Sequence, residues 1–136
     1  MPDAAYKEGD EVHSGVLYRR IFPHRDYYRD KDNPPRPTSV NFLPDGGPDP
    51  SVSMYRAAET TPSEVLEGHD GFGILEIDAE IFWGIGKRVT YEPKHGKGHV
   101  AVRTFTKRDD QPRRDAAFAS RVIVPPTLPE ARLTGG

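Results

Sequence analysis

The sequence contains no cysteine, which excludes disulfide bridges, thiolate zinc sites and cysteine nucleophiles. Hydrophobic residues make up only 35% of the 136 residues, so we expect a small core. No run of residues approaches the roughly 20 apolar positions of a membrane-spanning helix, and the opening stretch MPDAAYKEGDEV has no apolar core of a signal peptide. We therefore predict a cytoplasmic protein with no membrane partner.

An excess of charge of one sign is also missing, since 19 basic residues stand against 21 acidic ones for a formal net charge of −2. A near-neutral chain lacks the broad basic surface that drives binding to nucleic acid, so we do not expect nucleic acid as a partner. Glycine and proline, by contrast, are abundant at 13 and 14 residues, and they predict long loops. The chain length fits a single domain.

Several short segments are typical of β-strands, because they are rich in β-branched and aromatic residues and alternate between apolar and polar positions. The predicted strands lie at residues 15–22, 38–42, 51–55, 71–78, 87–92, 99–106 and 121–124. Between the first two strands, the segment PHRDYYRDKDNPPRP is dense in charge and proline and is expected to be an exposed loop. The runs 87–92 and 99–106 are predicted to form a hairpin.

Capping signals predict three short helices, in the segments PSEVLEG, AEIFWGIG and QPRRDAAFAS. Thr61 is a suitable N-cap for the first helix, with Pro62 at its first position and Glu64 where a capping box has a carboxylate. Asp78 is placed to cap the second helix. Strands that dominate, with short helices between them, predict a single small α+β domain around a mainly antiparallel twisted sheet. We assign residues 1–14 to a polar lead-in, 15–124 to the domain and 125–136 to an extended or disordered tail.

Two histidines, His95 and His99, lie four residues apart in KHGKGHVAVR. The glycines between them argue against a helix, so the spacing does not place both imidazoles on one face, and we predict no metal site. His95 is expected in a turn. His99 opens a strand in which it shares a face with Arg103, where a histidine beside a fixed cation is suited to acid-base chemistry or to an anionic ligand. The alternative is a solvent-facing strand of polar residues.

The stretch LYRRIFPHRDYYRD joins four arginines, one histidine and three tyrosines. Alternation along its strand places Tyr18 and Arg20 on one face, and Arg19 on the other face with core-like neighbours. Aspartates interleave with the arginines and weaken the local field. We therefore predict a small binding or accessory module that recognises a protein partner or an anionic ligand through this loop and the arginine-bearing sheet face.

An enzyme acting on a nucleotide is the alternative. In it, Arg19 or Arg20 together with Arg103 would hold phosphate, His99 would act as acid or base, and Ser53 would orient the substrate. This order of an early arginine, a serine strand and later carboxylates resembles the Arg, Ser-x-Ser, Glu succession of one class of ADP-ribosyltransferase folds. The resemblance implies NAD as cofactor under this alternative, and no cofactor is predicted otherwise.

A second resemblance covers the chain from Leu17 to about Val102. The segments LYRRI, SVNF and SVS, followed by a histidine before a valine-rich strand, resemble a type of small bacterial protein. The resemblance implies a bacterial, cytosolic, single-domain protein and implies no activity. The residues that it singles out are Arg19, Arg20, Ser39, Ser53 and His99.

Overall fold

The computed structural model describes residues 5–44, 50–106, 108 and 110–129. The elements found there are β1 (Val16–Ile21), β2 (Tyr28–Arg29), β3 (Arg36–Pro37), η1 (Ser39–Phe42), β4 (Val52–Arg56), α1 (Pro62–Leu66), β5 (Gly73–Asp78), α2 (Ala79–Gly84), β6 (Arg88–Tyr91), η2 (Pro93–His95), β7 (His99–Arg103), α3 (Asp110–Ala119) and β8 (Arg121–Val124). The two η elements are 3-10 helices. None of the helices in these ranges has the length and apolar character that a membrane crossing requires.

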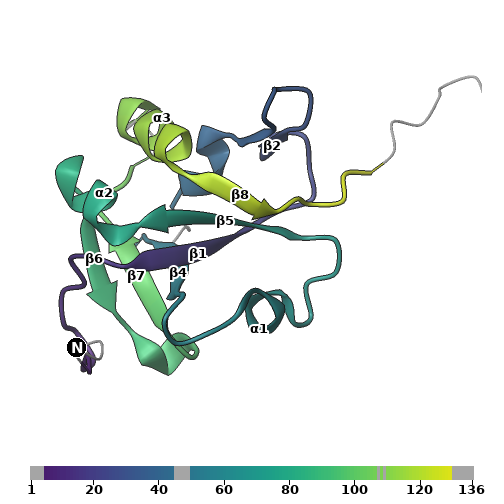
Figure 1. Cartoon of the computed structure of the whole chain (residues 1–136). Coiled ribbons are helices and arrows are strands. Elements are labelled where there is room, and N and C mark those ends of the chain that lie inside the picture. The colour runs from purple at the N-terminus through teal and green to yellow at the C-terminus, as the bar shows by residue number, and fades with distance from the viewer. Residues whose placement is uncertain (1–4, 45–49, 107, 109, 130–136) are drawn as a thin grey trace, which may run out of the picture.

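Six strands form one sheet in the order β6-β7-β4-β1-β5-β8, and each pairing in it is antiparallel. Strands β2 and β3 form a small separate antiparallel pair. Helices α2 and α3 and the β2–β3 pair lie on one side of the sheet, and α1 lies on the other (Figure 1). The predicted α+β class with a mainly antiparallel sheet is confirmed.

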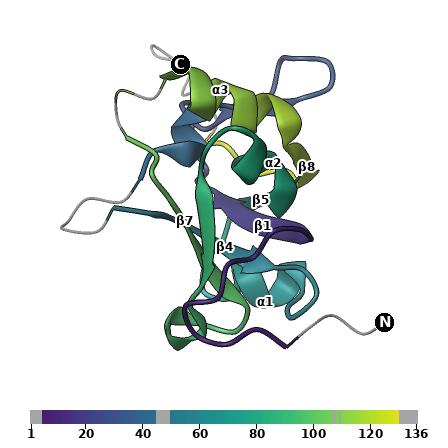
Figure 2. The same cartoon turned by 90° about the vertical axis from the view of Figure 1, so that its left-hand side faces the viewer.

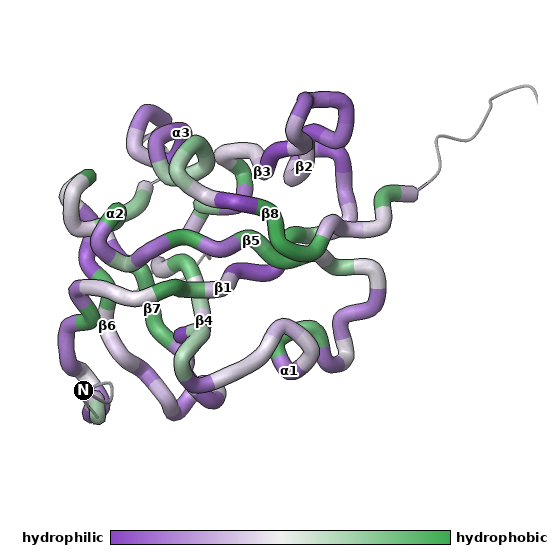
Figure 3. The backbone as a smooth tube through the Cα atoms, in the orientation of Figure 1, coloured by the Kyte–Doolittle hydropathy of each residue, from purple (hydrophilic) through white to green (hydrophobic). Residues whose placement is uncertain are grey.

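The main core lies on the side of the sheet that α2 and α3 cover, and the turned view shows both helices stacked over that face (Figure 2). Side chains alternate across the sheet as predicted: Val52 and Met54 of β4 are fully buried, while Ser53 between them is partly exposed on the opposite face. Hydrophilic residues cluster instead in the connection between β2 and β3 (Figure 3). Among the α-helices of the described residues, α1 lies over the face opposite the core, and this face, here called the open face, carries polar side chains such as Ser53.

The helix starts agree with the capping signals in the sequence. The hydroxyl of Thr61 accepts a hydrogen bond from the Glu64 backbone N–H at 3.2 Å, and Pro62 is the first residue of α1. The Asp78 carboxylate accepts one from the Glu80 N–H at 2.9 Å at the start of α2. Both caps satisfy backbone donors that a helix start leaves without an internal partner.

One local prediction between β1 and β4 is wrong. The segment 38–42, predicted as a strand, is the 3-10 helix η1, because the Asn41 amide donates to the carbonyls of Tyr27 and Thr38 at 2.7 and 2.9 Å and so holds the chain in a turn. The segment before it is mostly exposed, as predicted, but it also contains the β2–β3 pair. These contacts fold the loop back over the core.

Residues near both ends of the described chain pack against the domain. Val12, within the predicted polar lead-in, is fully buried, and its carbonyl accepts a hydrogen bond from the Trp83 indole at 2.7 Å. Near the other end, the Thr127 N–H donates to the Gly71 carbonyl at 2.8 Å. A Cβ on Gly73 would lie 2.4 Å from the Val124 carbonyl, so glycine allows β8 and the segment after it to approach β5. The rest of the predicted tail, residues 130–136, lies outside the described residues.

Candidate functional site

Four of the seven predicted site residues line two hollows on opposite sides of the sheet, and Tyr18, Arg19 and Arg20 line neither. The first, here called the sheet pocket, lies on the open face and has a cavity volume of about 420 Å³. Its lining residues are Ser51, Ser53, Tyr55, Glu92, His95, His99 and Arg103. The second, here called the arginine pocket, lies between the β2–β3 pair and α3 and has a volume of about 290 Å³. Its lining residues are Arg29, Asp32, Arg36, Pro37, Thr38, Ser39, Arg114, Ala117 and Phe118.

Strand pairing brings the sheet pocket together. Strands β4 and β7 are neighbours in which Tyr55 lies opposite His99, and Ser53 lies opposite Ala101. Because side chains alternate along a strand, Ser53 and Tyr55 of β4 share the open face with His99 and Arg103 of β7. Three residues that the enzyme alternative groups together, Ser53, His99 and Arg103, therefore line the same pocket.

His99 is held in a defined orientation. Its Nδ1 lies 3.2 Å from the backbone carbonyl of Glu92, and since a carbonyl can only accept, Nδ1 has the proton in this contact. Burial lowers the pKa of His99, and the neighbouring His95 lowers it further. A histidine with its pKa below the usual value of about 6.5 is neutral near pH 7, so Nε2 is left as a hydrogen-bond acceptor.

The charges of the sheet pocket are balanced internally. The Arg103 guanidinium forms an ion pair with the Glu92 carboxylate at 2.6 Å. The other carboxylate oxygen of Glu92 lies 3.9 Å from Nε2 of His95, whose ring is 5.3 Å from that of His99. His95 lies at the end of η2, in the turn before β7, as expected. The pocket therefore offers donors and acceptors side by side with little net charge.

Arg20 borders this pocket from β1. Its Nη2 donates to the Tyr55 hydroxyl at 3.1 Å, its Nε donates to the Val65 carbonyl at 2.8 Å, and its guanidinium lies 5.1 Å from the centre of the Tyr55 ring. Tyr18 lies on the same face, opposite Tyr55 in the β1–β4 pairing. Arg20 thus connects β1 and α1 to the pocket wall.

Arg19 lies on the other face of the sheet from His99. Its Nε donates to the Asn41 carbonyl at 2.7 Å and its Nη1 to the Ser53 carbonyl at 2.8 Å. The β1–β4 ladder covers only two residue pairs, so the Arg19 side chain binds a β4 carbonyl beyond the end of the ladder. Of the two adjacent arginines, only Arg20 reaches the wall of the sheet pocket.

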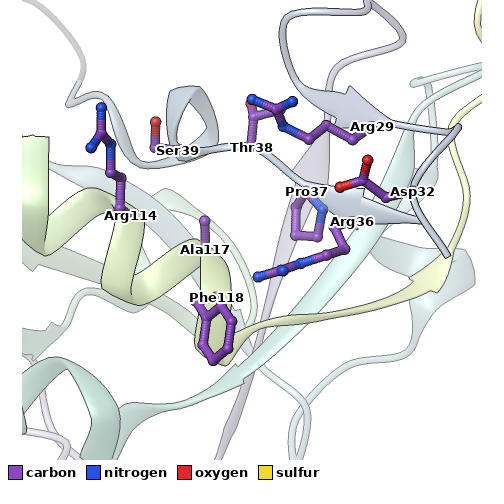
Figure 4. Close-up of a pocket in the computed structure, with 9 residues that line it drawn as sticks. All are labelled: Arg29, Asp32, Arg36, Pro37, Thr38, Ser39, Arg114, Ala117 and Phe118. Atoms are coloured by element: carbon purple, nitrogen blue, oxygen red, sulfur yellow. The ribbon is translucent and has the colours of Figure 1, made fainter. Parts of the chain in front are cut away.

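Ser39, the remaining predicted ligand-binding residue, lines the arginine pocket instead (Figure 4). Arg29 and Arg36 come from the β2–β3 pair, whereas Arg114 and Phe118 come from α3, one helical turn apart (Figure 4). The hydroxyl-bearing residues Thr38 and Ser39 lie between the two groups (Figure 4). The pocket therefore forms only where the loop after β1 packs against α3.

The arginines of this pocket differ in their partners. Arg114 forms an ion pair with Asp110 at 2.9 Å. Arg36 lies over the Phe118 ring, 4.6 Å from its centre. Within the described ranges, neither Arg29 nor Arg36 has a carboxylate at ion-pair distance, although Asp32 also lines the pocket and reduces its positive potential. Two guanidinium groups are thus available to an anionic group.

Several lining residues were missed in the sequence. Ser51 and Tyr55 lie two residues before and after Ser53, which was chosen from the Ser-x-Ser order, so alternation along the strand was a signal for them. To predict Glu92 as a lining residue, one needs the register of the β6–β7 hairpin, because that register places it beside His99. Arg114 and Phe118 have helical i, i+4 spacing, but nothing local indicates that this helix face meets the loop.

The described residues contain no group of three or more histidine, aspartate or glutamate side chains that could hold a metal ion. Comparisons with protein-family models, with curated proteins and with solved structures find no match to this chain. The chemistry of the two pockets is therefore the basis for assigning a function.

Proposed function

We propose that this protein is a small cytosolic binding module that recognises an acidic segment of a protein partner through the arginine pocket. The observation that supports this most directly is the position of Arg29 and Arg36, which line one pocket and have no carboxylate partner among the described residues. A guanidinium group binds carboxylate or phosphate oxygens through paired hydrogen bonds, and an unpaired one does so without first breaking an ion pair.

Phe118 favours a protein partner over a free small anion. Its side chain is 74% exposed at the rim of the pocket. An exposed aromatic beside arginines matches the composition of protein-protein contact sites, in which aromatic residues and arginine are enriched. The Ser39 hydroxyl provides a further donor to an anionic group, whereas the Thr38 hydroxyl already donates to the Asp26 carbonyl.

The test is a binding titration with a fluorescently labelled peptide of alternating glutamate and phosphoserine residues. We expect the double variant Arg29→Gln/Arg36→Gln to weaken binding by roughly 100-fold or more, because each charged hydrogen bond contributes about 1.5–3 kcal/mol. Binding by the unchanged protein should also weaken with added salt.

Arg25→Gln is the matched control. Arg25 is an exposed arginine of the same loop that does not line the pocket, so its substitution removes one charge without changing the site. Full affinity in Arg25→Gln and lost affinity in the double variant support the proposal. An equal loss in both would show that the peptide senses only overall charge, and no binding to the unchanged protein would overturn the proposal.

A nucleotide- or NAD-acting enzyme is the second candidate, because Ser53, His99 and Arg103 line one pocket. Under this candidate His99 would accept a proton and Arg103 would contact phosphate, with NAD as the predicted cofactor. Incubation with NAD or with cyclic nucleotides should then release product, and His99→Ala should abolish the release in a variant that still unfolds cooperatively. Absence of product from each compound would exclude this candidate.

A further inference from the structure

The sheet pocket has an acceptor atom that the rest of the described chain does not use. His99 is only 4% exposed, and its Nδ1 is bound to the Glu92 carbonyl. Its Nε2 makes no hydrogen bond to any described residue, although the side chain lines the pocket. Nε2 is not among the atoms of the described residues that are buried without a partner, so it opens into the pocket, where a donor from outside the chain can reach it.

The charged pair beside His99 argues against an anion as that ligand. Arg103 is bound to Glu92 at 2.6 Å, so an anion would have to displace the carboxylate or approach it closely. The pair presents a donor and an acceptor next to each other. A hydroxyl group is both donor and acceptor, so a ligand with several hydroxyls matches this arrangement without adding charge.

The hydroxyls of the pocket complete the set. Because the Tyr55 oxygen accepts a hydrogen bond from Arg20, its own proton is free to be donated. Ser51 and Ser53 add two groups that can donate or accept. A cavity volume of about 420 Å³ falls within the usual range for small-molecule sites.

We propose that the sheet pocket is a second binding site, separate from the arginine pocket, for an uncharged polyhydroxylated ligand such as a monosaccharide. Nε2 of His99 accepts a hydrogen bond from one ligand hydroxyl, while Glu92 and Arg103 accept from and donate to its neighbours. The proposal is independent of the anion recognition assigned to the arginine pocket, and it requires no reaction.

The test is an NMR titration of 15N-labelled protein with D-ribose, D-glucose and myo-inositol, with inorganic phosphate as the charged comparison. The chemical shifts of the His99 ring nitrogens should change on addition of at least one of ribose, glucose and inositol. They should change little or not at all on addition of phosphate. His99→Asn places an amide N–H where Nδ1 is, so it can keep the bond to Glu92 and remove the Nε2 acceptor. We expect this variant to lose roughly tenfold in affinity.

Two further variants separate binding from folding. His99→Gln places an amide near the position of Nε2 and should restore part of the affinity, a result that a purely structural role would not produce. The Arg29→Gln/Arg36→Gln variant should bind the sugars with the affinity of the unchanged protein. The two pockets are therefore tested independently. The proposal is overturned if none of the three probes binds, if phosphate alone binds, or if His99→Asn binds unchanged.

Discussion

The arginine pocket and the sheet pocket both contain arginine, but in different electrostatic states. In the arginine pocket, Arg29 and Arg36 have no carboxylate partner within the described residues, whereas in the sheet pocket Arg103 is bound to Glu92 at 2.6 Å. An unpaired cation favours a charged partner, and a paired one offers hydrogen bonds with little net charge. The number of arginines in a hollow is therefore a poorer guide to its ligand than the partners those arginines already have.

Adjacent residues of β1 extend this comparison to the interior. Arg19 binds two backbone carbonyls on the core side of the sheet, while Arg20 binds one carbonyl and the Tyr55 hydroxyl on the open side. If the core-side arginine serves the fold and the open-side arginine serves the pocket wall, the two should differ in their effect on stability.

The largest expected effect comes from this pair. Arg19→Met should lower the free energy of unfolding by about 2–4 kcal/mol, because it leaves the Asn41 and Ser53 carbonyls without their charged donor. Arg20→Met should cost only about 1 kcal/mol, since it removes the donor of one backbone carbonyl and the Tyr55 hydroxyl can still bond to water in the sheet pocket. Urea unfolding of both variants measures the difference. Equal losses of unfolding free energy would show that the two arginines contribute equally to the fold.

Features of the fold that depend on neighbours in sequence could be predicted. The caps at Thr61 and Asp78 and the alternation of Val52 and Met54 depend on residues within one turn or one strand. The 3-10 helix η1 could not be predicted in this way. Its turn depends on Asn41 reaching the carbonyl of Tyr27, a contact between residues 14 positions apart.

The site residues divide in the same way, into features that neighbours in sequence predict and features that depend on strand pairing. Ser53, His99 and Arg103 were chosen from the sequence, and alternation placed His99 and Arg103 on one face, but only the pairing of β4 with β7 brings Ser53 to them. The ion pair of Arg103 with Glu92 depends on the β6–β7 hairpin. Ser39 was grouped with these residues, yet it lies in the other pocket because the segment 38–42 turns instead of joining the sheet.

A pH titration probes the electrostatics of the sheet pocket. Burial and His95 lower the pKa of His99 in the folded chain, so below about pH 6.5 the unfolded chain binds the extra proton more readily. Stability should therefore fall as the pH drops from about 6.5 through the folded pKa of His99, and should be unaffected by this group above that range. Urea unfolding between about pH 7 and pH 5 should show a smaller decline in His99→Gln than in the unchanged protein.

The contribution of His95 can be separated in the same experiment. His95→Asn removes the positive charge that opposes protonation of His99, and should raise the pKa of His99 toward its ordinary value while leaving burial, the larger cause, in place. NMR titration of the His99 ring measures this directly. A His99 pKa that does not move would show that burial, and not His95, accounts for its lowering.

The smallest expected effect on stability tests the arginine pocket. Phe118 is 74% exposed, so Phe118→Ala should change the free energy of unfolding by less than about 0.5 kcal/mol. The same substitution removes the ring beneath Arg36 and should weaken binding of the acidic peptide several-fold, because a cation-π contact at an exposed site contributes about 0.5–1 kcal/mol. Phe22→Ala is the matched control, since Phe22 is 47% exposed and packs against Tyr27 and Phe72 away from the pocket. Because Phe22 lies in an aromatic cluster, its loss should lower the free energy of unfolding without changing the affinity for the peptide. If Phe118→Ala instead lowers the free energy of unfolding and leaves the affinity unchanged, Phe118 supports the fold and not a partner.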